Sequence, residues 1–458
     1  MSRVILFLAA ILTISLATVY LTIRLASVPI IEILQPTRFI GRTAVFEATI
    51  ETPRGVLSSI EAVIEQDDTR LNLFSLDHPT EAQLHQDSSN RIRITRTFDQ
   101  VSHPNLHSGP ARILMTATRP LLFGFTERNT TVVVDLQIKL EPPKLRVVSD
   151  FHYVNHGGSE LVIYQVTPPE AQSGVQVGNR FYRGYSTTGV GIENDSTLHM
   201  AFFALSYDQE LNTSIELYAR DEAGNESRLG FGARPYPKKF RRAKINISNK
   251  FLRRVVPAIL NQVPNFLGKQ PDNSDEELLK SYLLINGELR HRNQSSISAL
   301  ANLTSPQMLW KEPFRQLANS KVESGFADHR TYLYNDNEID QQIHLGFDLA
   351  STRNTPILSA NSGTVVYADY LGIFGNCVVI DHGMGLQSLY AHLSSINVSK
   401  GHYVEQNQEL GRSGQTGLAG GDHLHFTMLL QGYPVNPIEW WDPHWIEDRI
   451  LLKLREEN

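Results

Sequence analysis

The chain has 458 residues, which is enough for two to four domains of ordinary size. Apolar residues make up 41% of it and charged residues 20%, which excludes a chain that is disordered through most of its length. The net charge of -6 argues against a nucleic-acid binder, because the phosphate backbone favours basic proteins. The single cysteine, Cys377, excludes a disulfide within one chain, and its apolar neighbours predict a small buried side chain.

Residues 4–23 contain no charged side chain, with Arg3 before the run and Arg24 after it. A helix of this length, at about 1.5 Å per residue, spans a bilayer core of about 30 Å. The run is longer than the apolar region of a signal peptide, and no clean cleavage site follows it. We therefore expect residues 1–27 to be an uncleaved transmembrane anchor rather than a signal peptide, with the rest of the chain exported.

Two stretches of short predicted strands come next, at residues 28–140 and 141–240. Segments such as ARILMTATR and TTVVVDLQIKL alternate or run apolar with β-branched residues. Clusters of Pro, Gly, Asn and Asp separate them at spacings typical of a β-sandwich. The phrase ARDEAGN in the second stretch resembles the last-strand hairpin of bacterial immunoglobulin-like domains. We predict two β-sandwich modules in tandem, of which the second is immunoglobulin-like.

Residues 241–320 are predicted to be a helical connector. The segments FLRRVVPAILNQV and DEELLKSYLLINGEL have helical spacing of apolar residues. Ser274 followed by Glu277 is a capping-box pattern ahead of the second segment. The nine basic residues from Arg234 to Arg254, with no acidic one among them, are expected to form a solvated face.

Strands with many glycines return at residues 321–445, and 446–458 are expected to be a C-terminal tail. In HLGFDLA, His344 and Asp348 are four apart, and on a strand an even separation places both on one face. DHLHF does the same for His423 and His425, and SLYAHLS places His392 at the end of a strand.

Together these five residues supply what a catalytic zinc site needs. Such a site takes three ligands from His, Asp and Glu, and further neutral imidazoles can take and give protons. Each pattern alone is weak, and the other nearby histidines, His382 and His402, are expected to be structural or exposed. No serine, cysteine or carboxylate pair does as well, because GRSGQTG lacks the strand-to-helix context of a nucleophile elbow.

Residues 321–443 resemble the lysostaphin/LytM-type zinc endopeptidases of bacteria. The family's elements occur in order: SGFADHR, HLGFDLA, SANSGTVVYA, GNCVVIDHG, LYAHLS, HYVEQNQELGRSGQTG, GGDHLHF and VNPIEWW. One departure is Asn407, which stands where the family usually has glycine.

The resemblance implies a mainly β fold whose C-terminal domain is an open antiparallel sheet forming a groove. It implies one zinc per chain, held by His344, Asp348 and His425. It makes His392 and His423 the pair that polarises the water and stabilises the oxyanion. The glycines at 414, 417, 420 and 421 are expected to let a peptide approach closely.

We therefore expect a zinc metalloendopeptidase, held in the inner membrane by a single span, that hydrolyses peptide stems or cross-links of peptidoglycan in the periplasm. The alternative is a non-enzymatic envelope scaffold, or an activator of other wall hydrolases, that uses the groove for binding. A third, weaker interpretation is a protease that acts on an exported protein. The complete set of ligands favours an active enzyme, and the sandwich modules are candidates for binding a regulatory envelope partner.

Two segments are candidates for restraining such an enzyme. One is TYLYNDNEIDQQI, residues 331–343, whose Asn and Asp side chains could reach the metal position or the groove. Its plainer interpretation is a surface hairpin with Tyr332 and Tyr334 on one face of a strand. The other candidate is the helical connector, which must lie near the catalytic domain because few residues separate them.

Overall fold

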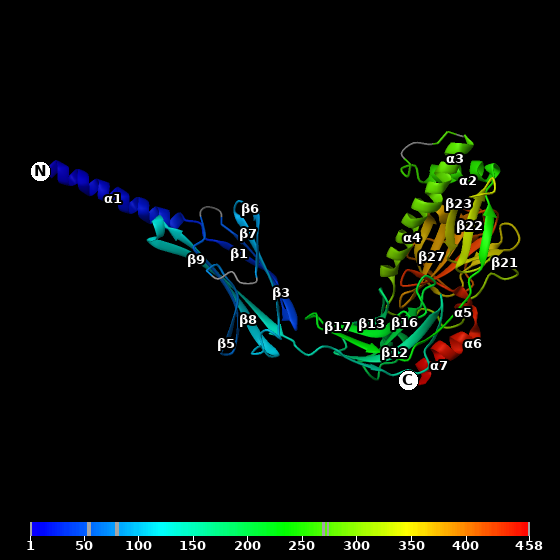
Figure 1. Cartoon of the computed structure of the whole chain (residues 1–458), viewed down its shortest axis with the longest axis horizontal. Coiled ribbons are helices and arrows are strands. Elements are labelled where there is room, and N and C mark those ends of the chain that lie inside the picture. Colours follow the sequence, from blue (N-terminus) through cyan, green and yellow to red (C-terminus); the bar gives the residue numbers. More distant parts are fainter. Residues whose placement is uncertain (1, 53–55, 78–81, 268–270, 273, 457–458) are drawn as a thin grey trace. The chain divides into compact units, whose positions relative to one another are not determined.

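Strands dominate the fold, and one long apolar helix precedes them (Figure 1), which confirms the predicted fold class. The computed structural model describes residues 2–52, 56–77, 82–267, 271–272 and 274–456. The chain divides into two compact units, the first formed by residues 1–143 and 220–227 and the second by residues 144–219 and 228–458.

The first unit begins with helix α1 (Ser2–Leu25). Its segment Val4–Leu21 is long and apolar enough to cross a bilayer, and within the described part of the chain no other helix meets this test. Length and composition of this kind suit a membrane span and also a signal sequence, so the two expectations for this segment stay open.

After α1, the first unit is a β-sandwich of two sheets with strand orders β1-β3-β7-β6 and β2-β9-β8-β4-β5. Alternation along β8 turns Ile113, Met115 and Ala117 inward, where they share a core with Phe46 of the other sheet. The elements are β1 (Ile30–Gln35), β2 (Phe39–Ile40), β3 (Thr43–Glu51), β4 (Ser59–Gln66), β5 (Thr69–Ser75), β6 (Gln83–Ser88), β7 (Arg91–Asp99), β8 (Gly109–Leu121), η1 (Leu122–Gly124) and β9 (Thr126–Ile138).

The second sandwich has sheets with strand orders β10-β12-β16-β15 and β14-β13-β17-β18, and a small sheet of β11 and β19. The ARDEAGN segment forms the end of β17 and the turn into β18, as the sequence predicts. The elements are β10 (Lys144–Val147), β11 (Tyr153–Asn155), β12 (Ser159–Thr167), β13 (Gln172–Val177), β14 (Arg180–Arg183), β15 (Tyr185–Ser186), η2 (Thr187–Val190), β16 (Leu198–Ala204), β17 (Ile215–Arg220), β18 (Glu226–Gly230) and β19 (Arg234–Tyr236).

Helices at residues 249–303, which we call the helical layer, follow the second sandwich. Ser248 caps the first of them by accepting a hydrogen bond from the Phe251 amide, and Ser274 caps the second by accepting one from the Glu277 amide. The layer consists of α2 (Asn249–Gln262), α3 (Asp275–Leu284), a π-helical turn η3 (Ile285–Leu289), α4 (Arg290–Ala299) and η4 (Leu300–Leu303).

The C-terminal domain is built on an eight-stranded sheet of order β21-β24-β32-β28-β27-β26-β30, with β33 paired to β32. Two three-stranded sheets flank it, with orders β20-β22-β23 and β25-β31-β29. The strands are β20 (Arg242–Asn246), β21 (Lys321–Ser324), β22 (Asp328–Tyr334), β23 (Asn337–His344), β24 (Phe347–Ala350), β25 (Pro356–Leu358), β26 (Gly363–Tyr370), β27 (Asn376–Gly383), β28 (Leu386–Leu393), β29 (Ser395–Ile396), β30 (Tyr403–Val404), β31 (Glu409–Arg412), β32 (Leu424–Leu430) and β33 (Tyr433–Val435). The helices are η5 (Gly372–Phe374), α5 (Pro437–Trp441), α6 (Pro443–Ile446), η6 (Glu447–Leu451) and α7 (Leu452–Glu456).

The segment 331–343 is a hairpin, but it is not the plain surface hairpin of the simpler expectation. Asn335 and Asp336 form its turn, and both take positive φ angles that Asn and Asp tolerate. Tyr332 is only 5% exposed and packs with Leu252, Leu278 and other apolar side chains of the helical layer. Figure 1 shows α2 and α3 beside β22 and β23.

The second sandwich and the C-terminal domain share one hydrophobic core. Phe202 of β16 contacts Trp440 of α5, with ring centroids 5.7 Å apart. The Ser159 amide donates to the Glu439 carboxylate at 2.7 Å. The predicted boundaries between the modules stay predictions, because these parts pack within a single compact unit.

The predicted C-terminal tail is anchored to the second sandwich. Lys453 of α7 donates a hydrogen bond to Glu160 of β12 at 3.0 Å, and the two side chains are 6% and 0% exposed. Burial raises the pKa of Glu160 and lowers the pKa of Lys453, so each charge depends on the other for stabilisation.

This pair yields a stability prediction. We expect Lys453→Met to lower the free energy of unfolding of the full chain at pH 7 by about 3 kcal/mol or more, because it strands the buried Glu160 carboxylate. The loss should shrink as the pH falls, since protonation of Glu160 removes the stranded charge. Denaturant unfolding measures this, and the double variant Glu160→Gln/Lys453→Met should recover part of the loss. A change below about 1 kcal/mol in the single variant would contradict the role of the pair.

Candidate active site

Three strands bring His344, Asp348 and His425 together. His344 ends β23, Asp348 lies in β24, and His425 lies in β32, where it is the direct register partner of Asp348. The expectation that His344 and Asp348 share one strand is wrong, because the chain passes from one sheet to another between them.

Gly346 makes this passage possible. A Cβ built on it would lie 2.5 Å from the Thr427 hydroxyl and 2.6 Å from the Phe426 carbonyl oxygen. A side chain does not fit there, so glycine lets the bend pack closely against β32. The bend then turns the imidazole of His344 back toward the carboxylate of Asp348.

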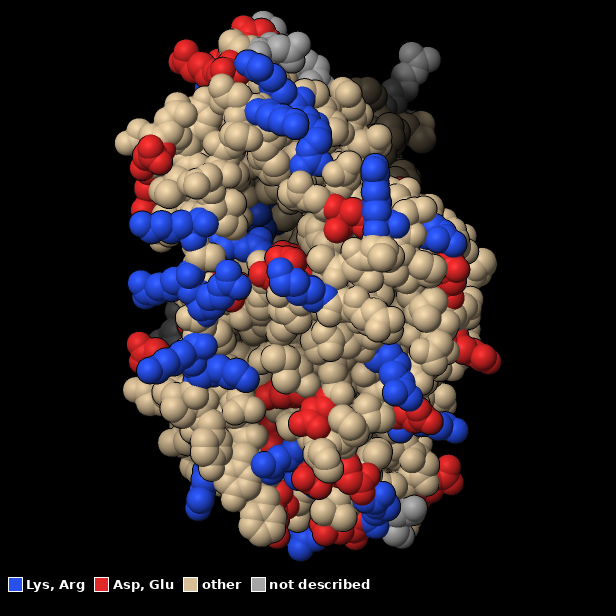
Figure 2. Space-filling model, turned by 90° about the vertical axis from the view of Figure 1, so that its right-hand side faces the viewer, with Lys and Arg blue, Asp and Glu red and all other residues tan. Residues whose placement is uncertain are grey.

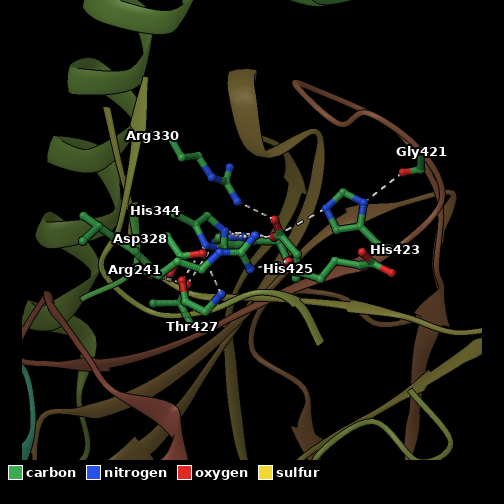
Figure 3. Close-up of polar contacts among 12 residues, drawn as sticks. Arg241, Asp328, Arg330, His344, Gly421, His423, His425 and Thr427 are labelled. Carbon is green, nitrogen blue, oxygen red and sulfur yellow. Dashed lines mark hydrogen bonds and ion pairs between the residues drawn. The ribbon is translucent and has the colours of Figure 1, made fainter. Parts of the chain in front are cut away.

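The ligand atoms of these three residues are close together. Oδ1 of Asp348 lies 2.9 Å from Nε2 of His344 and 3.0 Å from Nδ1 of His425. The two ring nitrogens are themselves 3.0 Å apart. Figure 3 shows the two imidazoles turned toward one position in the cleft.

The other nitrogen of each ring is held by the protein. Nδ1 of His344 donates to the Gly325 carbonyl at 2.9 Å. The Thr427 hydroxyl donates to the Leu345 carbonyl at 2.8 Å, so it can accept from Nε2 of His425, which is 3.0 Å away. These bonds fix the tautomers, and the nitrogens that face Asp348 are left with lone pairs.

In these tautomers two lone pairs and a carboxylate oxygen converge with no donor hydrogen between the two rings. Such a set of acceptors is repulsive by itself and is relieved by a cation. Imidazole nitrogen and carboxylate oxygen are also the donor atoms that Zn²⁺ takes in catalytic sites. The residues present thus fit a zinc ion, and the three ligand atoms lie within 4.8 Å of one another.

His392 and His423 lie beside this group. His392 is near the end of β28, as predicted, and Nδ1 donates to the Thr416 carbonyl at 2.9 Å. His423 precedes β32 rather than lying within it, and its Nδ1 donates to the Gly421 carbonyl at 2.9 Å, as Figure 3 shows. Their ring centroids are 4.8 Å apart, and Nε2 of His423 lies 3.5 Å from Oδ1 of Asp348, so the two rings border the same small volume as the ligand atoms.

The pKa shifts differ among the histidines and the aspartate of the site. Burial lowers the pKa of His425 to about 4 and that of His392 well below its usual value, so both rings are neutral at pH 7. Burial would raise the pKa of Asp348, but the neighbouring histidines lower it well below its usual range. Burial likewise opposes charge on His423, yet the hydrogen bond and charge of Asp348 raise its pKa.

Arg330 is a member of the site that sequence reasoning missed. Its guanidinium donates to Oδ2 of Asp348 at 2.8 Å, whereas Oδ1 is the oxygen that faces His344 and His425. The side chain is mostly buried, and its Nε has no hydrogen-bond partner in the described part of the chain. No spacing rule points to this contact, because it depends on the register of the β22–β23 hairpin against β24.

All five residues predicted for the site open onto one cleft of about 760 Å³. The opposite wall of the cleft is formed by residues that lie outside the strands that carry these five residues. The lining from β20, the two residues that follow it and the helical layer is Ile245, Asn246, Ile247, Ser248, Lys250, Phe251, Arg254, Tyr282 and Arg290. Figure 2 shows Lys and Arg gathered along one edge of this side of the molecule, next to a hollow.

The four glycines expected to admit a peptide divide into two pairs. Gly420 and Gly421 line the cleft and have open space where a Cβ would be. Gly414 and Gly417 instead pack against backbone atoms of residues 392–394 and 373–375, so their role is internal packing. Asn407 has φ of +69°, a conformation that explains why a glycine is usual at that position.

The remaining candidates are structural, as expected. His382 is fully buried between the Ser362 carbonyl and the Ser388 hydroxyl, and His402 is exposed. Cys377 is buried, and burial raises the pKa of its thiol.

Part of the C-terminal domain matches a known protein family. Residues 342–437 match peptidase family M23. The chain is 41% identical over 96 residues to peptidoglycan DD-endopeptidase ShyA of Vibrio cholerae, which covers 21% of this chain and 22% of that protein. It is 36% identical over 97 residues to DD-carboxypeptidase/endopeptidase Mpg of Neisseria meningitidis, which covers 21% and 22%.

Among solved structures, the lysostaphin catalytic domain from Staphylococcus simulans is similar at 28% identity, covering 27% of this chain and 92% of that one with a TM-score of 0.23. The chain spans about a fifth of the length of the curated relatives named above. Because the matched segment contains all five residues gathered at the cleft, the C-terminal domain of this chain belongs to peptidase family M23.

Proposed function

We propose that this chain is an exported zinc metalloendopeptidase that hydrolyses peptide stems or cross-links of peptidoglycan. The observation that carries the proposal is the convergence of three acceptor atoms, from His344, Asp348 and His425, with two further imidazoles beside them. A binding scaffold has no need of this arrangement, which favours an enzyme over the non-enzymatic alternative.

His344, Asp348 and His425 would hold one zinc ion per chain. When bound there, zinc supplies a Lewis acid that lowers the pKa of water toward about 7. The chain's own contribution is orientation: the Gly325 carbonyl, Thr427 and Arg330 hold the three ligand side chains in place from behind.

His392 and His423 would carry protons and steady the developing negative charge on the scissile carbonyl. Each ring donates Nδ1–H to a backbone carbonyl, so Nε2 is an acceptor in the neutral ring and a donor once protonated. Nε2 can therefore take a proton from the attacking water and return it to the leaving amine.

The substrate class and location rest on two further supports. ShyA, one of the relatives, is a peptidoglycan DD-endopeptidase. The apolar segment Val4–Leu21 suits a single-pass anchor in the inner membrane, which would leave the catalytic domain in the periplasm. A regulatory envelope partner on the sandwich modules stays a prediction.

The first test concerns the metal. We expect the purified exported part, residues 25–458, to hold about one zinc per chain, and substitution of His344, Asp348 or His425 by Ala to lower the zinc content sharply. Elemental analysis after dialysis measures this. His402→Ala, at an exposed histidine of the same domain, is the matched control and should keep its zinc. Stoichiometric zinc in folded His425→Ala would contradict the ligand assignment.

The second test concerns catalysis. We expect His392→Ala and His423→Ala to keep zinc and fold but to lose about 10²- to 10⁴-fold in turnover, because they act on protons rather than on the metal. The assay is digestion of purified sacculi of defined chemistry, with the released fragments identified by mass. If both variants stay within about threefold of wild type, these roles are wrong; if no wall peptide is cleaved by zinc-loaded wild type, the proposed function falls.

A further inference from the structure

The helical layer places an arginine in the cleft that the metal centre does not require. Arg290 is the first residue of α4 and directly follows the π-helical turn Ile285–Leu289. Turns of this kind are rare and occur often at functional sites. Arg290 lines the same cleft as His344, Asp348 and His425.

Arg290 has hydrogen bonds but no ion pair within the described residues. Its Nε donates to the Asn286 carbonyl at 3.0 Å, and one terminal nitrogen donates to the Asn286 side-chain oxygen at 2.5 Å. Asn286 is fully buried and in turn donates to Asp340 at 2.6 Å. The neutral amide of Asn286 therefore links Arg290 to the carboxylate of Asp340. The other terminal nitrogen of Arg290 has no hydrogen bond in the described part of the chain.

The positive charge of Arg290 has no direct ion-pair partner among the described residues. Burial lowers the pKa of Arg290 and the nearby charge of Arg330 adds to the lowering, whereas Tyr332, Tyr282 and the carboxylate of Asp340 oppose it. Arg330 shares its own charge with Asp348, whose other oxygen faces the metal position. A divalent cation bound at that position would make this part of the cleft still more positive. Arg290 is half-buried, and a cation partly withdrawn from water without a directly bonded counter-ion is costly. A bound anion reduces that cost.

We propose that Arg290 and Arg330 form a carboxylate-binding subsite beside the metal centre, which selects peptides that carry a free carboxylate near the scissile bond. This inference rests on the proposed function and narrows its substrate class to acidic peptides, as opposed to neutral bridges. The planar guanidinium fork matches a carboxylate in two parallel hydrogen bonds, which a lysine does not provide.

Two carboxylates of a wall peptide could occupy the subsite: the terminal α-carboxylate, or the side-chain carboxylate of a diamino acid. The test therefore uses three soluble cross-linked stem peptides, one with both carboxylates free, one with the terminal carboxylate amidated and one with the side-chain carboxylate amidated. Binding is measured by calorimetry on the zinc-loaded full chain carrying His392→Ala, so that the peptides survive.

We expect the free acid to bind about 10- to 100-fold more tightly than one of the amidated forms, as the loss of a charge-assisted hydrogen bond implies. The form that loses affinity identifies the carboxylate. Arg290→Gln should abolish the preference, whereas Arg290→Lys should keep part of it, because the charge remains while the fork is lost. Arg292→Gln, at an exposed arginine of the same helix, is the matched control and should leave the preference intact.

The outcomes separate this inference from the hydrolase proposal. A preference below about threefold, a preference that survives Arg290→Gln in folded protein, or binding of none of the peptides would overturn the subsite. Hydrolysis of the same peptides is measured with His392 intact and decides the proposed function by itself. Cleavage without a charge preference overturns only the subsite, and Arg290-dependent binding without cleavage overturns only the hydrolase.

Discussion

The site depends on three hydrogen-bond acceptor atoms that face one another and to which the protein supplies no donor. Nε2 of His344, Nδ1 of His425 and Oδ1 of Asp348 face one another at 2.9 to 3.0 Å. The tautomers that cause this are fixed by the Gly325 carbonyl and by Thr427, so the rings cannot turn a donor inward without losing a buried hydrogen bond. The fold therefore stores an unfavourable arrangement that a cation relieves, and the rest of the domain serves to hold it.

The sequence predicted that the five residues would lie together, which the cleft shows, but it did not predict the reason for their convergence. H-x-x-x-D suggested one strand face, but His344 and Asp348 meet because Gly346 lets the chain bend between two sheets. Elements with local signals were predictable, such as the Ser274 cap and the strand that ends near His392. Arg330 and Arg290 were not, because each reaches the cleft through hairpin register or a π-turn, and neither leaves a periodic trace in the sequence.

The second sandwich is a structural support of the catalytic domain within the second unit. Trp440 packs on Phe202, Glu439 accepts hydrogen bonds from Asn155 and Ser159, and Lys453 pairs with Glu160. A fragment limited to residues 321–458 would expose Trp440 and leave Lys453 without its partner. Comparing such a fragment with the longer chain would therefore confuse lost stability with lost restraint, and substitutions in the intact chain are the sounder way to study the cleft.

The same reasoning bears on whether the helical layer acts as a lid. The Asn and Asp side chains of the 331–343 hairpin do not bond to the metal-site residues: Asp340 accepts from Asn286, and Asn335 and Asp336 form the turn. Polar bonds join the layer to both lips of the cleft, from Tyr334 to Asn249 and from Arg254 to the Ala419 carbonyl, each worth about 1 kcal/mol net. Beneath them, Tyr332 and Ile373 are buried among Leu252, Val256 and Tyr282, and exposing each such side chain costs about 1.5–3 kcal/mol. The apolar contacts outweigh the polar ones. Separating the helical layer from the cleft would therefore cost more free energy than one contact with a bound peptide provides. The layer is thus a fixed wall of the cleft, and a fixed wall is what allows Arg290 to recognise substrate from outside the family domain.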